Sequence, residues 1–205
     1  LENKKREMSK EKAKQTKLGY TPVSDAEVMA EANATYGTPS LAEITNTRQE
    51  LNTRRMKEKT LGFSYASKDD ARNNLIAEEA KRLRAAGTTG SALDSALNKY
   101  AGTITAPQVD AELTRFNQER LQKAVQKMSP SKASELPEDI MTADIVREFN
   151  ENQATNVFRN APDSTIKAFR KSVSEHVLSL YRAGKTSEAR AYIAMVREAS
   201  RRATR

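Results

Sequence analysis

The sequence predicts an all-α fold, and three observations lead to this prediction. Glycine, proline and serine residues divide the chain into segments whose apolar residues recur at three- and four-residue steps, the spacing of one helix face. The stretch that most resembles a strand, 103–105, is too short to be one. The composition, 37% hydrophobic and 30% charged with 5% aromatic residues, favours helices that each bury a narrow stripe. We expect about seven to eight helices arranged as hairpins or a bundle.

Four serine-led signatures predict helix starts in the first half of the chain. In a capping box, the serine hydroxyl accepts a hydrogen bond from the amide three residues on, and the acidic residue there reaches back to the serine amide. Such pairs are Ser24 with Glu27, Ser40 with Glu43, Ser67 with Asp70, and Ser91 with Asp94. The glycines expected to end these four helices are Gly37, Gly62, Gly87 and Gly102.

The second half of the chain predicts further helices on either side of a linker. A fifth helix is expected after Pro107, because apolar residues from Val109 to Met128 follow a helical spacing. Beyond the linker, one helix is expected around 142–158, followed by an amphipathic hairpin that turns at Gly184. The predicted organisation is a basic arm over 1–20, extended or disordered, a helical region over 21–128, a linker over 129–137, and a helical region over 138–205 that ends in a hairpin at 164–200.

The net charge of +8 is concentrated at the two ends of the chain. Residues 1–20 hold seven Lys/Arg against three Glu, residues 182–205 hold seven against two Glu, and the rest is nearly balanced. Basic ends of this kind are expected to contact nucleic acid, acidic lipid or an acidic protein surface. The residues predicted to make such contacts are Lys4, Lys5, Arg6, Lys10, Lys12, Lys14, Arg190, Arg197, Arg201, Arg202 and Arg205. In the last predicted helix, Arg190, Arg197 and Arg201 are expected to share one face.

The turn of the predicted C-terminal hairpin resembles the inter-helix corner of a tetratricopeptide repeat. The residues that match are Tyr181, Gly184, Glu188, Ala189 and Tyr192. The resemblance covers about 30 residues and occurs once, whereas repeat folds need about three copies. It implies one antiparallel hairpin, in which Tyr181 and Tyr192 are expected to be core contacts; the alternative is that they form a protein interface that binds a peptide.

The histidine, glycine and acidic residues of the sequence do not form a recognisable catalytic, metal-binding or phosphate-binding motif. The chain has no cysteine, and its one histidine, His176, is too few for a multi-histidine zinc site. Gly184-Lys185-Thr186 ends like a phosphate-binding loop, but the required earlier glycine is Ser179. Adjacent carboxylates on a helix point in different directions, so none of the acidic pairs is expected to flank a substrate bond. We therefore expect no enzymatic activity, no cofactor and no metal.

These observations together favour a non-enzymatic structural protein that assembles into a large complex, as a homo- or hetero-oligomer. The composition suggests an internal or scaffolding component of a virus particle, phage-like, located in the virion or the cytoplasm. Two alternatives are a non-specific nucleic-acid-binding accessory protein and a helical protein–protein adaptor. No apolar run is long enough for a transmembrane segment. Since the sequence begins with Leu1, we expect it to be part of a longer protein.

Overall fold

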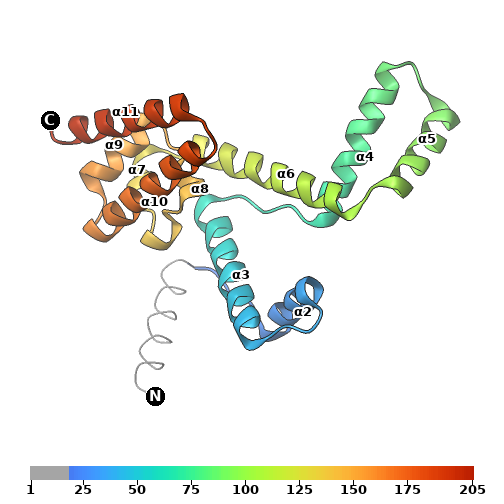
Figure 1. Ribbon diagram of the computed structural model, residues 1–205, viewed down its shortest axis with the longest axis horizontal. Helices are drawn as coiled ribbons and strands as arrows, with labels where there is room; N and C mark the ends of the chain where they lie inside the picture. Colours follow the sequence, from blue (N-terminus) through green and yellow to red (C-terminus); the bar gives the residue numbers. More distant parts are fainter. Residues whose placement is uncertain (1–18) are drawn as a thin grey trace. The chain divides into compact units, whose positions relative to one another are not determined.

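The structure is a computed structural model that describes residues 19–205, and over this range the fold is all-α, as predicted (Figure 1). The described residues form ten α-helices, eight of them with seven residues or more, one 3-10 turn and no strand. The helices are α2 (Asp25–Tyr36), α3 (Leu41–Leu61), α4 (Lys68–Ala85), α5 (Gly90–Thr103), α6 (Ala106–Lys127), α7 (Pro130–Ser134), α8 (Ala143–Val146), α9 (Glu151–Asn160), α10 (Asp163–Arg182) and α11 (Thr186–Ala203), with the 3-10 turn η1 at Glu138–Ile140.

The chain divides into two compact units at positions that differ from the predicted linker. One unit contains the described residues up to Phe63 together with Ala124–Arg205, and the other is Ser64–Lys123. The predicted linker, 129–137, lies inside the first unit, where it forms α7 and the segment that follows. Its apolar residues explain the difference, because Ala133 and Leu136 are buried at 0% and 2% exposure. Proline at the first position of α7 starts a helix here rather than interrupting one.

The C-terminal part of the first unit has a closed hydrophobic core. Helix α9 packs against α7 and α11, and α10 packs against α8 and α11. Phe169 of α10 is fully buried at the centre. Its ring stacks on Phe149 with centroids 5.9 Å apart and meets the edge of Phe158 at 5.3 Å. Ring pairs at these separations stabilise a core beyond the area they bury.

Side chains of the later helices satisfy the main-chain carbonyls of the irregular segment around α7 and α8. Gln153 is fully buried, and its side-chain amide donates to the carbonyls of Val125 at 2.8 Å and Met128 at 2.9 Å. Helix α10 and helix α11 contribute further bonds of this kind. They run from Thr165 to the Leu136 carbonyl, from Ser172 to the Met141 carbonyl and from Tyr192 to the Val146 carbonyl. Buried carbonyls without a donor destabilise a fold, so these bonds fix the segment in place.

The helix predicted around 142–158 is two helices in the structure, α8 and α9. The break falls at Asn150, whose side chain accepts from the Gln153 amide while the Gln153 side chain accepts from the Asn150 amide. Asparagine at this position competes with the helix by bonding to nearby amides, and so starts a new helix.

The N-terminal part of the first unit is a hairpin of α2 and α3. Both predicted capping boxes, at Ser24 and Ser40, are present. Val28 and Ala32 of α2 are fully buried in the hairpin. The Val23 amide donates to the Asn52 side chain at 3.0 Å, which holds the start of α2 against α3.

The second unit contains α4, α5 and the part of α6 up to Lys123. The predicted capping box at Ser67 is present. The predicted start at Ser91 is wrong, because α5 begins at Gly90 after Thr89. Gly90 has a positive φ of 60°, which glycine adopts without strain and which turns the chain into the helix earlier. Asn74 of α4 donates to Glu112 of α6 at 2.6 Å, so a buried carboxylate joins these two helices.

Candidate interaction surfaces

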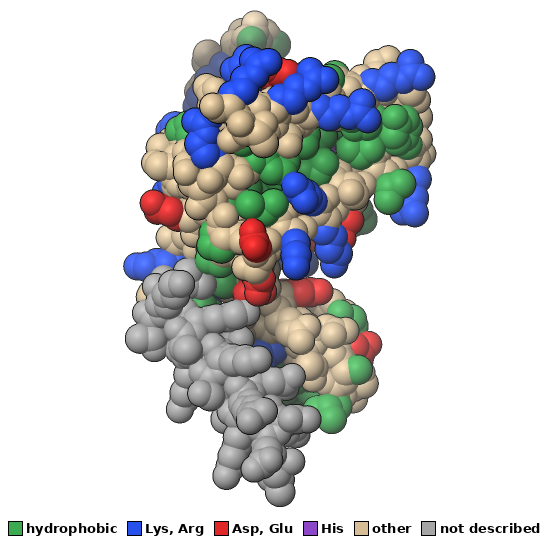
Figure 2. Space-filling view, turned by 90° about the vertical axis from the view of Figure 1, so that its left-hand side faces the viewer, with side chains coloured by type: hydrophobic (Ala, Val, Ile, Leu, Met, Phe, Trp, Pro, Cys, Tyr) green, Lys and Arg blue, Asp and Glu red, His purple; other side chains and the backbone are tan. Residues whose placement is uncertain are grey.

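Helix α11 presents three of the predicted arginines on one exposed face. We call Arg190, Arg197 and Arg201 the arginine face; all three are exposed, while Ala189 and Ala199 on the other side of α11 are fully buried. The helix follows the turn at Gly184, where a φ of 74° explains why glycine is required. Figure 2 views the molecule from the side of the C-terminal bundle and shows Lys and Arg side chains gathered there.

The predicted C-terminal arginines differ in what they contact. Among the described residues, the side chains of Arg190, Arg197 and Arg205 have no hydrogen bond or ion pair. Arg201 lies 3.4 Å from Glu198, and Arg202 lies 2.8 Å from Glu151. Ion pairs to nearby carboxylates lower the capacity of an arginine to bind a further anion, so Arg190 and Arg197 are the better candidates for a partner's phosphate or carboxylate.

Arg159 extends the basic surface beyond α11, and the sequence pattern did not reveal it. Its guanidinium donates to the Arg202 carbonyl at 2.6 Å, which ties α9 to the last turn of α11. Cations are favourable at a helix C-terminus. No local spacing indicates this contact, because the two residues are 43 positions apart. The other predicted residues, Lys4, Lys5, Arg6, Lys10, Lys12 and Lys14, lie outside the described residues.

The two tyrosines predicted at the C-terminal hairpin have different environments. Tyr192 packs on His176 with ring centroids 4.7 Å apart and donates to the Val146 carbonyl at 2.8 Å, so it is a core contact. Burial raises the pKa of the Tyr192 hydroxyl. Burial, with the nearby Arg147 charge, lowers the pKa of His176, which favours a neutral structural histidine. Tyr181 is 43% exposed, so the expectation that it is a core contact is wrong, and the alternative, contact with a partner, stays a prediction.

Helices α4 and α5 hold an apolar stripe that their own unit covers only in part. In these two helices the buried residues are Ala71, Ala80 and Leu93. Five larger apolar side chains of these helices are half-buried. We call them the α4–α5 stripe: Leu75, Ile76, Leu83, Leu97 and Tyr100. Their remaining exposed area is available for contact with another molecule.

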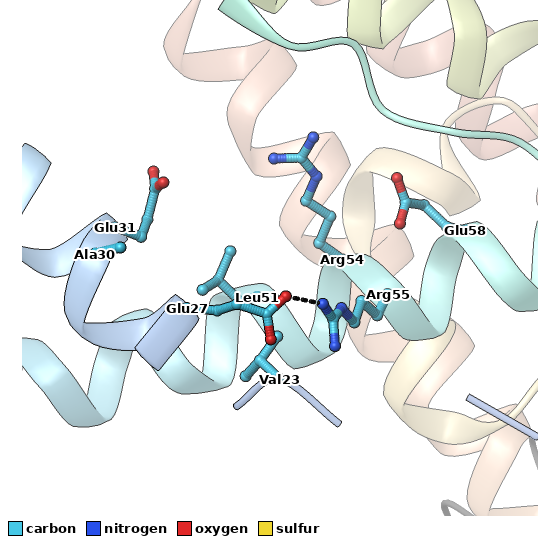
Figure 3. Close-up of a pocket in the computed structure, with 8 residues that line it drawn as sticks. All are labelled: Val23, Glu27, Ala30, Glu31, Leu51, Arg54, Arg55 and Glu58. Carbon is cyan, nitrogen blue, oxygen red and sulfur yellow. Dashed lines mark hydrogen bonds and ion pairs between the residues drawn. The ribbon is translucent and has the colours of Figure 1, made fainter. Parts of the chain in front are cut away.

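A pocket of about 450 Å³ lies between α2 and α3 (Figure 3). Glu27 forms an ion pair with Arg55, which also donates to the Pro22 carbonyl at 2.9 Å. Hydrogen bonds from Ser24, together with Arg55, hold the pKa of Glu27 below its usual value and keep the carboxylate charged. The charges of this pair compensate one another, so the pair acts to hold the hairpin together.

A larger groove, of about 910 Å³, lies in the C-terminal bundle, and no pattern in the sequence pointed to it. Three carboxylates, those of Glu135, Glu138 and Asp139, lie along it, and none of its lining residues is a lysine or arginine. Leu136 and Pro137 are among its apolar lining residues. We call this feature the acidic groove. It forms where α7 and η1 meet the end of α9 and the start of α10, which brings together residues 131–165.

Two other kinds of site are absent from the part of the chain that the structure describes. Residues 19–205 contain no cluster of three or more histidine and acidic side chains placed to hold a metal ion. None of the described helices has the length and apolar character needed to cross a membrane.

Comparison with protein-family models, with curated proteins and with solved structures finds no match to this chain. The fold and its surfaces define an all-α protein with a basic face, an acidic groove and a partly covered apolar stripe. These three surfaces are the features from which a function can be inferred.

Proposed function

We propose that this chain is a non-enzymatic assembly protein whose helices complete their burial against other subunits. The observation that supports this is the contrast between its two units. The C-terminal bundle fully covers large side chains, including Ile140, Ile145 and Phe169. The helices α4 and α5 of the second unit bury two alanines and one leucine, and leave the α4–α5 stripe half-exposed.

This contrast has a thermodynamic consequence for the second unit. A unit of 60 residues (Ser64–Lys123) buries a smaller share of its surface than a larger domain does, and is marginally stable alone. Covering the α4–α5 stripe with a partner would remove apolar area from water, at about 25 cal/mol per Å². Contact between subunits therefore stabilises this unit as well as the complex. The setting we favour is an internal or scaffolding component of a virus particle, which the low aromatic content and alanine-rich helices support.

The test is the mass of the full chain in solution, measured by light scattering over a range of protein concentrations. We expect a defined oligomer, and we expect the variant Ile76→Lys to shift it towards monomer. The matched control is Ala77→Lys, which adds the same charge at the next position of α4, on an exposed residue. A chain that is monomeric at every concentration, or equal effects of the two variants, would contradict the proposal.

A second measurement covers the case in which Ile76→Lys unfolds α4. Hydrogen exchange of the unmodified chain is measured at low and high concentration. Amides of α4 and α5 are expected to exchange more slowly at high concentration, because the stripe is then covered. Exchange that does not change with concentration would exclude self-association through this stripe.

Binding to nucleic acid is a second candidate, and the arginine face supports it. Arg190 and Arg197 are exposed and have no partner among the described residues, so their guanidinium groups are available to phosphate. Such contact would be independent of sequence and strongly dependent on salt. The test is the salt dependence of DNA binding by the double variant Arg190→Ala/Arg197→Ala.

A further inference from the structure

We propose that the acidic groove binds the basic N-terminal segment, residues 1–18, of a second copy of this chain. The proposal rests on the proposed function in one respect, that copies of the chain associate. It adds a second contact with a defined chemistry, carboxylates on one copy and ammonium groups on the other.

The groove is a site of opposite charge to the protein as a whole. The chain has a net charge of +8, but the groove is lined by Glu135, Glu138 and Asp139 and by no basic side chain. Glu135 and Glu138 are exposed, and neither carboxylate has a hydrogen bond or ion pair with another described residue. These two carboxylates are therefore free to bind a cation from outside the unit.

The groove also offers an apolar surface and a fixed shape. The apolar surface comes from Pro137, which is half-buried, and Pro162, which is exposed. The shape is fixed from below, where Leu136 is 2% exposed and the Thr165 hydroxyl donates to the Leu136 carbonyl at 3.3 Å. Pro137 and Pro162 restrict the backbone on both sides. A groove held by buried contacts of this kind loses little conformational entropy when a segment binds.

The sequence of residues 1–18 matches these features. It holds seven Lys/Arg against three Glu, so its charge is opposite to that of the groove. Met8 is the apolar residue at its centre, with Arg6 two positions before it and Lys10 two positions after it. A methionine between cations fits a groove with apolar walls and free carboxylates, since the flexible thioether adapts to irregular surfaces. No other part of the sequence combines this charge with an apolar centre and lies outside the described helices.

The first experiment measures binding of a fluorescent synthetic peptide with the sequence of residues 1–18 to the full chain, by anisotropy. We expect binding that weakens between about 50 and about 300 mM salt, because exposed charges are screened over that range. The double variant Glu135→Gln/Glu138→Gln is expected to bind about three- to tenfold more weakly, as each exposed ion pair contributes modestly. The control Glu31→Gln/Glu50→Gln removes the same charge from α2 and α3 and should not change the affinity.

Equal affinities for the groove variant and the control variant would overturn the proposal. A peptide that shows no binding at low salt would also overturn it. Both variants change exposed side chains only, so circular dichroism is expected to show the same helix content in each.

The second experiment uses cysteine cross-linking, which is unambiguous because the chain has no cysteine of its own. The single variants Met8→Cys and Glu138→Cys are mixed and oxidised, and we expect a cross-linked heterodimer between them. The control replaces Glu138→Cys with Glu50→Cys and should give little product. In the double variant Met8→Cys/Glu138→Cys, a cross-link within one monomer would show that the segment binds its own chain, and would overturn the second-copy assignment.

The outcomes separate this proposal from the proposed function. An oligomer by light scattering, with neither peptide binding nor cross-linking, would leave the proposed function intact and exclude the groove contact. A cross-link between copies, with no effect of Ile76→Lys on mass, would support the groove contact and exclude association through the α4–α5 stripe.

Discussion

The Lys57 ammonium lies 2.8 Å from the Asp144 carboxylate, so an ion pair joins α3 to α8 across 87 positions of sequence. The Lys57 side chain is 10% exposed, whereas that of Asp144 is 38% exposed. The pair is one of the contacts that hold the α2–α3 hairpin to the C-terminal bundle within the first unit.

Asp144→Asn is expected to weaken this connection. The substitution leaves the buried Lys57 ammonium without its carboxylate, which costs free energy because a buried charge needs a partner. Since Asp144 is more than a third exposed, solvent screens the pair, and we expect a loss of about 1 kcal/mol in the free energy of unfolding. Urea unfolding measures it, with Glu50→Gln on α3 as a control that should have no effect. Equal stabilities of the two variants would show that the pair contributes nothing.

The same pair predicts a dependence of stability on pH. Burial acts to raise the pKa of Asp144, but bonds from Lys57 and Thr142 outweigh it, and the pKa lies below its ordinary value of 3.8. A carboxyl with a lowered folded pKa stabilises the fold above its unfolded pKa and loses this effect as pH falls through the folded value. Stability is therefore expected to fall below about pH 4–5. The difference in stability between wild type and Asp144→Asn should shrink over that range, and a constant difference would contradict the assignment.

Gln153→Leu is expected to be more destabilising than Asp144→Asn. It removes the donor to the buried Met128 carbonyl, and it leaves the Val125 carbonyl with the Met128 amide as its remaining donor. The expected loss is about 2 kcal/mol, because unsatisfied buried polar groups are costly. Thermal unfolding should show a fall in Tm of about 5 °C. Gln126→Leu, at an exposed position of α6, is the matched control, and a similar shift in that variant would refute the role of the Gln153 bonds.

The contrast between Ser24 and Gln153 explains how far the sequence predicts this structure. The capping box of Ser24 is local, so the four residues from Ser24 to Glu27 contain both of its hydrogen bonds. The partners of Gln153 are 25 and 28 residues away, and no periodicity reveals them. The all-α class and most helix starts were therefore predictable. The structure of residues 129–137 was not, because Pro130 also fits the first position of a short helix and Pro137 fits the start of a 3-10 turn.

The candidate surfaces divide in the same way. The arginine face was predictable, since Arg190 and Arg197 are on one helix and helical spacing sets their direction. The acidic groove was not, because Glu138 and Pro162 meet only after α9 folds back between them. The partial exposure of Ile76 was not predictable either. Helical spacing shows which face of α4 is apolar, but it does not show what packs against that face.

Tyr192→Phe tests whether the C-terminal hairpin needs its tyrosine hydroxyl. Removing the hydroxyl leaves the Val146 carbonyl with the Phe149 amide as its remaining donor, and we expect the lost bond to lower the free energy of unfolding by about 1 kcal/mol. Tyr181→Phe, at a 43% exposed position, should leave stability unchanged. If Tyr181→Phe destabilised the chain as much as Tyr192→Phe, the assignment of Tyr192 to the core would fail.

The adaptor alternative has a separate test at Tyr181. If Tyr181→Ala removed binding to a partner protein without unfolding the chain, that alternative would gain support.

The double variant Arg190→Ala/Arg197→Ala tests the nucleic-acid alternative. Each phosphate that an arginine neutralises releases a counterion, so the slope of log affinity against log salt reports the number of contacts. Duplex DNA of mixed sequence is titrated at several salt concentrations. If the arginine face binds the DNA, the double variant should reduce that slope by about 2, and should weaken binding equally for unrelated sequences.

The matched control is Lys81→Ala/Arg82→Ala, which removes two positive charges from α4. These charges pair with Glu78 at 2.7 Å and with Glu79 at 2.5 Å. Unchanged slopes in both variants would exclude the arginine face as a phosphate-binding surface, and equal reductions would mean that net charge alone attracts the DNA.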